Sequence, residues 1–296
     1  IRRQRQMCIR DRMYGDRVKF KKYALDASRR YEETKDKKYL KEISKYNNIQ
    51  MARKIALNSA YGAIGNQYFR YYNEKMATAI TTSGQLSIRW IENKVNDYLN
   101  GILQTTDEDY IIASDTDSIY VTFDELVRKS FGERTDVPTE RVIDFLDKIA
   151  KEKMEPYIDK CYEELAEYVK AYAQKMEMSR EVIADKGIWT AKKRYILNVH
   201  DSEGVRYAEP KLKIMGIEAV KSSTPGPCRE KIKEVLKVIV NEDDKAVNKF
   251  IQDFRKEFLS LPVEEIAFPR SVNGLRKWGD KTTIFKKKCP MHIKGA

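Results

Sequence analysis

Cysteine and histidine are scarce in this sequence of 296 residues, which contains four cysteines and two histidines. No two cysteines lie close enough to form a Cys-x-x-Cys pair, and no spacing typical of a zinc site occurs. We therefore expect reduced thiols, and we expect neither histidine-based catalysis nor a metal cage made of these residue types. The residues concerned are Cys8, Cys161, Cys228, Cys289, His200 and His292.

Long apolar runs are missing as well. No stretch approaches the roughly 20 apolar residues of a membrane-spanning helix, and the sequence has no acylation signal, internal repeat or low-complexity tract. Charge is abundant instead, because 57 Lys and Arg against 45 Asp and Glu leave a net charge of +12. A protein this basic usually binds a polyanion. With no membrane partner expected, the composition favours nucleic acid, and 42% hydrophobic residues suffice for the cores of two or three domains.

Residues 1–12 differ from the rest of the chain. They contain five arginines, no acidic residue before Asp11 and little hydrophobic periodicity. A basic arm, a targeting segment and a leader fused to the protein would each fit, whereas a secretory signal also needs an apolar core. We favour a non-native leader.

The segment that follows predicts mostly helix. A charged stretch with few helix breakers predicts a helical hairpin whose tip lies near residues 32–36. Its second arm, residues 39–61, ends at Gly62 and Gly65, as the carboxyl end of a helix should. Small and apolar residues at helical spacing then predict a long helix over residues 74–99.

Alternation of apolar and polar residues predicts a β-hairpin at residues 110–123, with an acidic turn. Beyond it we expect a helical region that opens at Pro138 and is interrupted at Pro156. A strand within residues 189–199 and two amphipathic helices from Pro227 onward complete the pattern. The predicted apolar core stripe after Pro156 consists of Ile158, Cys161, Tyr162, Leu165, Val169 and Tyr172.

Two aspartates, Asp115 and Asp117, lie in the acidic turn. On extended backbone, an Asp-x-Asp pair directs both carboxylates to one side of the strand. A hard cation such as Mg²⁺ would relieve their repulsion, and Mg²⁺ takes substrate phosphate oxygens as further ligands. Nucleotidyl transfer uses two such ions, one at the attacking hydroxyl and one at the leaving phosphate. The alternative is a solvated turn, because Asp-x-Asp by itself is common.

Two further clusters suit phosphate and nucleic acid. On a helix, Lys54, Asn58 and Tyr61 form one polar stripe, in which a cation, an amide and a ring could contact a triphosphate and a base or sugar. Residues 192–195, Lys-Lys-Arg-Tyr, place three cations and an aromatic ring at the mouth of a strand, which suits a nucleic-acid backbone. The alternatives are an ordinary amphipathic helix and a solvated basic strand end.

The order and spacing of these three motifs are specific where each alone is not. Lys-x-x-x-Asn-Ser-x-Tyr-Gly at residues 54–62, Asp-Thr-Asp-Ser at 115–118 and Lys-Lys-Arg-Tyr at 192–195 resemble the ordered motifs of family B DNA polymerases. The resemblance runs from about Met13 to the end of the chain and is closest to the T-even-type bacteriophage subgroup. Stretches that resemble this subgroup are residues 66–72, 77–82, 153–156, 208–216, 222–225 and 289–295.

The resemblance implies a role for each matching residue. Arg17, Lys21 and Lys54 match the fingers cations that grip the incoming triphosphate. Asn58 lies beside them, and Tyr61 matches the tyrosine next to the nascent base pair. Asp117 matches the direct ligand of both catalytic Mg²⁺ ions, Asp115 the adjacent, more peripheral carboxylate, and Glu181 a palm carboxylate behind the metal site. Residues implied to contact primer–template DNA are Lys192, Lys193, Arg194 and Tyr195 and, at the thumb base, Lys221, Ser222 and Ser223.

The sequence departs from the family pattern in several places. Nothing upstream of Met13 resembles the strand motif Asp-x-x-Ser-Leu-Tyr-Pro, which supplies a second metal-binding aspartate, and no exonuclease or amino-terminal domain is seen. The fingers hairpin is shorter than in the best-known relatives, and the glycine-rich loop before Trp189 is abbreviated. Ser179 stands where those relatives often have an aspartate. From the resemblance we expect an incomplete thumb, without the C-terminal tail that meets the sliding clamp in the phage enzymes.

We therefore predict an α+β fold of the polymerase right-hand type, with a helical-hairpin fingers domain, an antiparallel-sheet palm and a partial helical thumb. The expected activity is template-directed addition of dNTPs to a primer 3′-hydroxyl in the cytoplasm, of the host if the protein is viral. With one of two main metal-binding aspartates, the chain should be inactive or nearly so alone. The alternatives are a non-catalytic nucleic-acid-binding module derived from a polymerase and another two-metal nucleotidyl transferase. The predicted domains are a leader at 1–12, fingers at 13–67, palm at 68–210 and thumb at 211–296.

Overall fold

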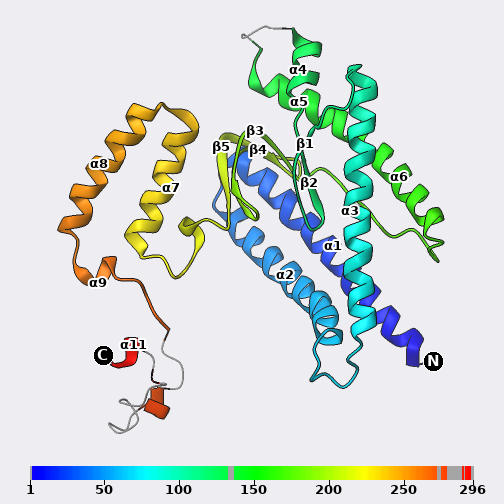
Figure 1. Ribbon diagram of the computed structural model, residues 1–296, viewed down its shortest axis with the longest axis horizontal. Helices are drawn as coiled ribbons and strands as arrows, with labels where there is room; N and C mark the ends of the chain where they lie inside the picture. The colour runs from blue at the N-terminus through cyan, green and yellow to red at the C-terminus, as the bar shows by residue number, and fades with distance from the viewer. Residues whose placement is uncertain (1, 133–136, 272–274, 279–288, 290, 295–296) are drawn as a thin grey trace. The chain divides into compact units, whose positions relative to one another are not determined.

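The fold combines long helices with two small antiparallel sheets (Figure 1). This composition confirms the predicted α+β class. The chain divides into two compact units: the first contains residues 1–184 and 199–211, and the second contains residues 185–198 and 212–296. Among the described residues, no helix is both long enough and apolar enough to cross a membrane. The computed structural model describes residues 2–132, 137–271, 275–278, 289 and 291–294.

Two helices in the first unit form the predicted helical hairpin. α1 (Arg2–Thr34) and α2 (Lys38–Ile64) pack against each other and are joined by residues 35–37. The helical backbone of α1 passes without a break from the predicted leader into the predicted fingers. At its other end the hairpin stops at Gly65, whose N–H donates to the Tyr61 carbonyl at 3.1 Å. The predicted carboxyl end is therefore confirmed at this glycine, three positions beyond the first one proposed.

The core of the first unit lies between α3 (Glu74–Leu103) and α6 (Glu155–Tyr168). α3 begins at the predicted residue because the side chain of Asn73 accepts a hydrogen bond from the Met76 N–H at 3.0 Å. It extends to Leu103 rather than to Leu99. The buried side chains follow helical spacing and are Ile91, Val95, Leu99 and Leu103 on α3 and Ile158, Cys161, Tyr162 and Leu165 on α6.

The helix before α6 departs from the prediction at Pro156. α5 (Thr139–Ile149) continues into a π-helical turn, η1 (Ala150–Met154), and this turn leads directly into α6. The predicted interruption is therefore wrong. The wider π turn ends just before the proline, which then lies in the first turn of α6, where a missing N–H is tolerated.

The predicted core stripe on α6 is confirmed only in part. Its first four members are buried, but Val169 is 47% exposed and Tyr172 is fully exposed. The last two predictions are wrong because α6 ends at Tyr168, so the helical spacing that would have turned these side chains inward stops before them.

The predicted β-hairpin is confirmed. β1 (Ile111–Asp115) pairs antiparallel with β2 (Ser118–Val121), and Asp115 is the partner of Ser118 at the turn. α4 (Asp124–Phe131) follows β2 directly. The side chains of Ile111, Ile119 and Val121 pack against the α3–α6 core, so the hairpin is anchored on its apolar side.

A three-stranded sheet, in the order β3–β4–β5, contributes residues to both units. The predicted strand within residues 189–199 is found in β4 (Arg194–Ser202). Residues 189–191 belong to β3 (Val182–Ala191), a strand that the sequence did not predict. β5 (Val205–Met215) completes the sheet.

A buried ion network holds the turn between β4 and β5 within the first unit. Arg180 forms ion pairs with Asp147 and Asp201. Arg206 also contacts Asp201, at 3.2 Å, and reaches Asp144 at 3.0 Å. Asp201 is 2% exposed, so its negative charge depends on these two arginines.

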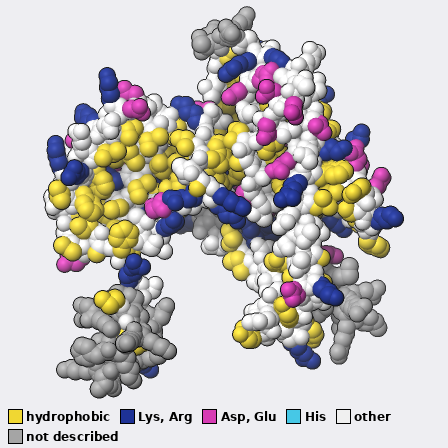
Figure 2. Space-filling model, in the orientation of Figure 1, with side chains coloured by type: hydrophobic (Ala, Val, Ile, Leu, Met, Phe, Trp, Pro, Cys, Tyr) yellow, Lys and Arg dark blue, Asp and Glu magenta, His cyan; other side chains and the backbone are white. Residues whose placement is uncertain are grey.

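The second unit is mostly helical outside the sheet. α7 (Gly226–Asn241) has Pro227 in its first turn, as predicted, and α8 (Asp244–Ser260) follows it. Figure 2 shows apolar side chains at the surface of this helix pair. Ile239 and Ile251, predicted for the apolar faces, are 41% and 54% exposed, so these faces are only partly covered.

A small core joins the sheet to α7 inside the second unit and consists of Ile196, Ile217, Ala219 and Leu236.

The closing motif predicted at 289–295 is described in part, because Pro290 and Gly295 lie outside the described residues. Ile1 of the predicted leader also lies outside them. The short helices of this unit are η2 (Glu218–Val220), α9 (Val263–Ile266), η3 (Leu275–Trp278) and α11 (Met291–Lys294).

Candidate functional site

The acidic turn presents its two carboxylates differently. Asp115 is the last residue of β1 and is half-buried, whereas Asp117 lies in the turn and is exposed. Thr116 has a φ of 58°, and the Asp117 N–H donates to the Asp115 carbonyl at 2.6 Å. The expectation that both aspartates lie on extended backbone is therefore wrong. A tight turn, rather than strand pleating, sets the spacing of the two carboxylates.

The turn offers two of the oxygen ligands that Mg²⁺ prefers. In the part of the chain that the structure describes, no group of three or more His, Cys, Asp and Glu side chains could hold a metal ion. Asp115 and Asp117 thus fit a divalent cation in ligand type and accessibility but leave its coordination to be completed by other groups. Substrate phosphates and water are natural candidates for some of these positions.

Asp117 also acts electrostatically on the core beneath it. Burial raises the pKa of Tyr162 on α6, and the negative charges of Asp117 and Asp159 raise it further. Tyr162 is 3% exposed. The acidic turn is therefore close enough to the α3–α6 core for a buried phenol to sense its charge.

This proximity predicts a titration result. Tyr162 should ionise above the usual tyrosine pKa of about 10, and Asp117→Asn should lower the pKa of Tyr162 by removing a nearby negative charge. Because the folded-state pKa is raised, neutral Tyr162 stabilises the fold at ordinary pH, and this contribution is lost as pH rises through the folded pKa. Absorbance at alkaline pH measures the effect, and subtraction of the Tyr162→Phe spectrum isolates this phenol. An unchanged pKa in the Asp117 variant, with Asp107→Asn as control, would contradict the geometry.

The predicted fingers cations lie on the hairpin of the first unit. Lys54, Asn58 and Tyr61 do form one stripe on α2, and all three are exposed. Arg17 and Lys21 lie one turn apart on α1 and are half-buried. The structure thus places the predicted triphosphate contacts on two packed helices.

An ion contact between α1 and α2, which the sequence did not predict, lies next to these cations along the hairpin. Arg53 Nε lies 3.8 Å from Asp16 Oδ2, so residue 53 of α2 stands opposite residue 16 of α1. Arg17 and Lys54 each follow one of these two residues, and the link therefore brings them to the same level of the hairpin. The buried Nε of Arg17 has no hydrogen-bond partner among the described residues. Only the three-dimensional pairing of α1 with α2 could have revealed Arg53 and Asp16.

Aromatic rings hold the two arms together nearer the tip. The ring centroids of Tyr23 and Tyr46 are 5.4 Å apart in an edge-on arrangement, and Phe20 stacks on Tyr46 at 6.2 Å. Contacts of this kind stabilise beyond the apolar area they bury. The cations on the two helices are therefore carried by a packed support rather than by separate helices.

The predicted DNA contacts belong to the second unit. Lys192 and Lys193 form the turn between β3 and β4, and both are exposed. Tyr195 points the other way: it is 6% exposed and stacks with Trp189 at 6.3 Å. Burial makes Tyr195 a support for the basic turn rather than an open stacking surface.

Two other predicted DNA contacts share one carboxylate. Glu218 forms an ion pair with Arg194, and its other oxygen lies 3.0 Å from Lys221. The hydrogen bond from Lys221 is the largest cause that lowers the pKa of Glu218. Ser222 and Ser223 follow Lys221 and are exposed. The structure therefore joins the β4 end of the basic motif to the predicted base of the thumb.

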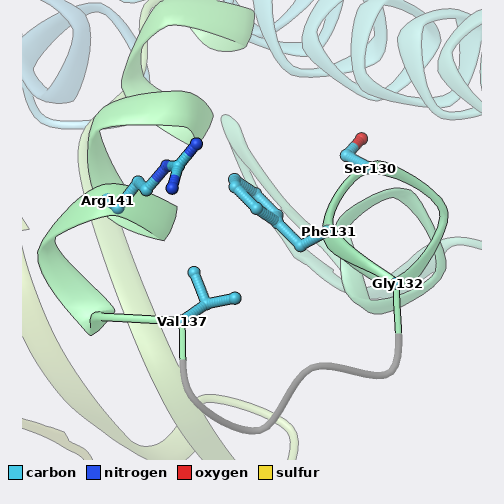
Figure 3. Close-up of a pocket in the computed structure, with 5 residues that line it drawn as sticks. All are labelled: Ser130, Phe131, Gly132, Val137 and Arg141. Atoms are coloured by element: carbon cyan, nitrogen blue, oxygen red, sulfur yellow. The ribbon is translucent and has the colours of Figure 1, made fainter.

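Glu181 lies just before β3 in the first unit and is exposed. Its carbonyl accepts a hydrogen bond from the Glu203 N–H at 2.7 Å, so it is tied to the turn between β4 and β5. A pocket between α4 and α5 is shown in Figure 3, and the described residues that line it include no carboxylate. Arg141, which lines it, lies 5.8 Å from the Phe131 ring. None of the predicted site residues is among the described residues that line this pocket.

Comparison of the sequence with known proteins shows what the chain is similar to. A family model described as DNA polymerase family B matches residues 25–133, a range that contains the α2 stripe and the acidic turn. A DNA-directed DNA polymerase of Enterobacteria phage T4 is 43% identical over 261 residues, which covers 84% of this chain and 28% of the relative. The chain belongs to the family B DNA polymerases. A DNA-directed DNA polymerase of Escherichia phage RB69 is 46% identical over 254 residues, covering 83% of the family B chain and 28% of that relative.

The family B chain spans about 28% of the length of these two curated relatives. The range of the family model includes the motifs at residues 54–62 and 115–118. Membership in the family, predicted from three motifs and their spacing, is confirmed.

Proposed function

We propose that this family B chain forms part of a DNA-directed DNA polymerase that adds dNTPs to a primer 3′-hydroxyl on a DNA template. The observation that carries the proposal is an Asp-x-Asp turn with an exposed Asp117 in the same unit as a hairpin that presents an exposed Lys54. Identities of 43% and 46% to phage DNA polymerases support it. The partners of the whole enzyme would be primer–template DNA, dNTPs and, through a C-terminal segment, a sliding clamp.

In this proposal the fingers comprise residues 13–67, the palm residues 68–210 and the thumb residues 211–296. Bound Mg²⁺, two ions in the full enzyme, would activate the 3′-hydroxyl and neutralise the leaving pyrophosphate. Asp117 and, more peripherally, Asp115 would hold the ions, with Glu181 behind them. This type of catalysis consists mainly of positioning and charge neutralisation, which are tasks that a rigid turn can perform.

The helices of the hairpin would bind the nucleotide. Lys54, as a compact charge with three donors, suits phosphate oxygens, and Arg17 offers a planar fork for the same group. Asn58 can donate a hydrogen bond one turn further along α2, and Tyr61 offers a ring face to the base or sugar. Because α1 and α2 are packed together, with the Arg53–Asp16 contact between them, the helices that carry these cations are already paired before a triphosphate binds.

The two carboxylates of the acidic turn give a reason to expect no catalysis by this chain alone. No third metal-binding side chain gathers with them among the described residues. We therefore infer that primer extension by the chain is absent or close to it. Robust extension that disappears in Asp117→Ala would contradict this inference.

Separate charge deletions should distinguish nucleotide binding from DNA binding. Lys54→Ala should weaken Mg²⁺-dependent capture of a matched dNTP by the chain–DNA complex about tenfold or more, because a hydrogen bond to a charged group is lost. Lys193→Ala should instead weaken duplex binding and reduce its salt slope by about one. Fluorescence anisotropy with labelled DNA, and with labelled dNTP added to the complex, measures both.

Two lysines provide matched controls for that experiment. Lys41→Ala removes an exposed charge from the same helix as Lys54, and Lys237→Ala removes one from α7 in the unit of Lys193. Equal weakening of both kinds of binding by Lys54→Ala and Lys193→Ala would overturn the division of roles.

The second candidate is a non-catalytic nucleic-acid-binding module, which the two-carboxylate turn favours. It predicts salt-dependent duplex binding with no Mg²⁺-dependent capture of a matched nucleotide. Capture of the matched dNTP over a mismatched one would exclude this candidate. Equal capture of ribonucleotides and deoxynucleotides would instead favour another class of two-metal nucleotidyl transferase.

A further inference from the structure

The turn between β4 and β5 is fastened to α1 within the first unit. Glu203 Oε1 accepts a hydrogen bond from Lys21 Nζ at 2.7 Å, and this ion pair joins residues 182 positions apart. Arg29 donates from Nε to the Gly204 carbonyl at 3.0 Å and from Nη2 to the Glu203 carbonyl at 3.3 Å. Both the side chain and the backbone of the turn are therefore held by one helix.

The turn is also fixed by contacts that do not involve the side chain of Glu203. The buried Asp201 carboxylate accepts a hydrogen bond from the Gly204 N–H at 2.9 Å while it pairs with Arg180 and Arg206. The Glu203 N–H is bound to the Glu181 carbonyl. Because this frame is independent of the ion pair, it aims the Glu203 carboxylate at Lys21 even when the pair is broken.

A second ion pair extends the contact along α1. Lys211 Nζ on β5 lies 2.6 Å from Glu32 Oε1, and Lys35 also contacts Glu32. Burial alone would raise the pKa of Glu32, but hydrogen bonds from Lys211 and Lys35 outweigh it and lower the pKa. The β4–β5 hairpin thus contacts α1 at Lys21, Arg29 and Glu32.

We propose that Glu203 is an internal competitor of the nucleotide triphosphate, a carboxylate that neutralises Lys21 until phosphate oxygens displace it. The proposal rests on the proposed function, in which Lys21 contacts the triphosphate. A carboxylate and a phosphate oxygen compete for the same compact ammonium group. The buried Nε of the neighbouring Arg17 has no hydrogen-bond partner among the described residues, so the Glu203 carboxylate is paired with Lys21 and not with that atom.

Removing the charge of Glu203 should therefore strengthen phosphate binding. Inorganic tripolyphosphate, titrated into the full chain by calorimetry at low salt, should bind about two- to fivefold more tightly to Glu203→Gln, which is the range expected from losing a partly exposed ion pair. Glu209→Gln is the matched control, since it removes the same charge from an exposed position on β5. In a Lys21→Gln background, Glu203→Gln should have no effect.

A second measurement needs no phosphate. Acetylation of Lys21 by a small amine-reactive reagent, followed by mass spectrometry, should be faster in Glu203→Gln and in Glu203→Ala than in the unsubstituted chain or in Glu209→Gln. The substitutions leave the backbone contacts of the turn in place, so the fold should be retained.

The outcomes separate this inference from the proposed function. If Lys21→Gln weakens tripolyphosphate binding but Glu203→Gln changes neither binding nor acetylation, competition is refuted and the role of Lys21 stands. Equal strengthening by Glu203→Gln and Glu209→Gln would also refute competition, because it indicates a general charge effect. Binding that is insensitive to Lys21 in every background would remove the proposed role of Lys21, and the competition with it.

Discussion

Replacing Arg180 with methionine should lower the free energy of unfolding of the first unit by about 3–5 kcal/mol, the usual cost of breaking a buried ion pair from one side. The Arg180 side chain is 10% exposed and pairs with both Asp147 and Asp201. Arg206 still contacts Asp201 in the variant, but among the described residues Asp147 would keep only the exposed Lys151 as an ion-pair partner. Methionine retains much of the apolar stem, so the loss reports on charge rather than on volume.

Urea unfolding followed by circular dichroism measures this loss, and Lys151→Met is the matched control. Lys151 also pairs with Asp147, at 2.7 Å, but its side chain is 57% exposed, so its removal should cost less than about 1 kcal/mol. If the Arg180 substitution costs no more than the Lys151 substitution, the network does not stabilise the unit as described.

The same network predicts how the loss depends on pH. Burial alone would raise the pKa of Asp147, but hydrogen bonds from Lys151 and Arg180 outweigh it and hold the pKa below its usual value. A lowered folded-state pKa gives stability that is present above the unfolded pKa of about 3.9 and lost as pH falls through the folded pKa. The difference between the unsubstituted chain and Arg180→Met should therefore shrink in this acidic range.

Replacing Gly216 with alanine should destabilise the second unit by about 2–4 kcal/mol, the range expected for steric overlap combined with backbone strain. Gly216 has a φ of 67°, and a Cβ atom there would lie 2.1 Å from the Lys193 carbonyl oxygen. The obstacle is backbone rather than a flexible side chain, so the turn at Lys192 and Lys193 must move. Duplex binding should weaken together with stability.

Gly226→Ala is the control for this substitution. Its φ is not in the left-handed region, and the nearest heavy atom to an added Cβ, on Arg229, lies 4.0 Å away. Thermal unfolding and duplex binding should both stay near the values of the unsubstituted chain in this control. If Gly216→Ala unfolds at the same temperature as Gly226→Ala, the β3–β4 turn is not held by this close approach.

Local patterns predicted the parts of the fold that depend on neighbouring residues. The α1–α2 hairpin, α3 and the β1–β2 hairpin were all foreseen, because periodicity and turn chemistry act over a few residues. β3 was missed because its segment includes Asp185, Lys186 and Gly187, which do not favour a strand, and pairing with β4 overrides that preference. At Pro156 the prediction failed in the opposite way. The sequence predicted an interruption, but the π turn before the proline accommodates its missing N–H and the helix continues.

The candidate site, too, was predictable from the sequence only in part. The stripe on α2 and the two aspartates followed from spacing, and their assigned roles came from the resemblance to family B polymerases. The acidic turn itself was predicted, but spacing could not predict the positive φ of Thr116, which sets how the two carboxylates lie. Nor could it predict the Lys21–Glu203 and Asp16–Arg53 pairs, because no sequence period connects residues so far apart.

The two ion pairs that fasten α1 to the β4–β5 hairpin have a mechanical consequence. Lys21 and Glu32 are 11 residues apart, which corresponds to roughly 16 Å along a helix axis that rises 1.5 Å per residue. A rod pinned at one point can pivot, but a rod pinned at two separated points cannot rotate about either while both remain attached. Opening the Lys21 contact alone therefore leaves α1 held at Arg29 and Glu32, so the Lys21–Glu203 pair can exchange with phosphate while the helix keeps its place on the hairpin.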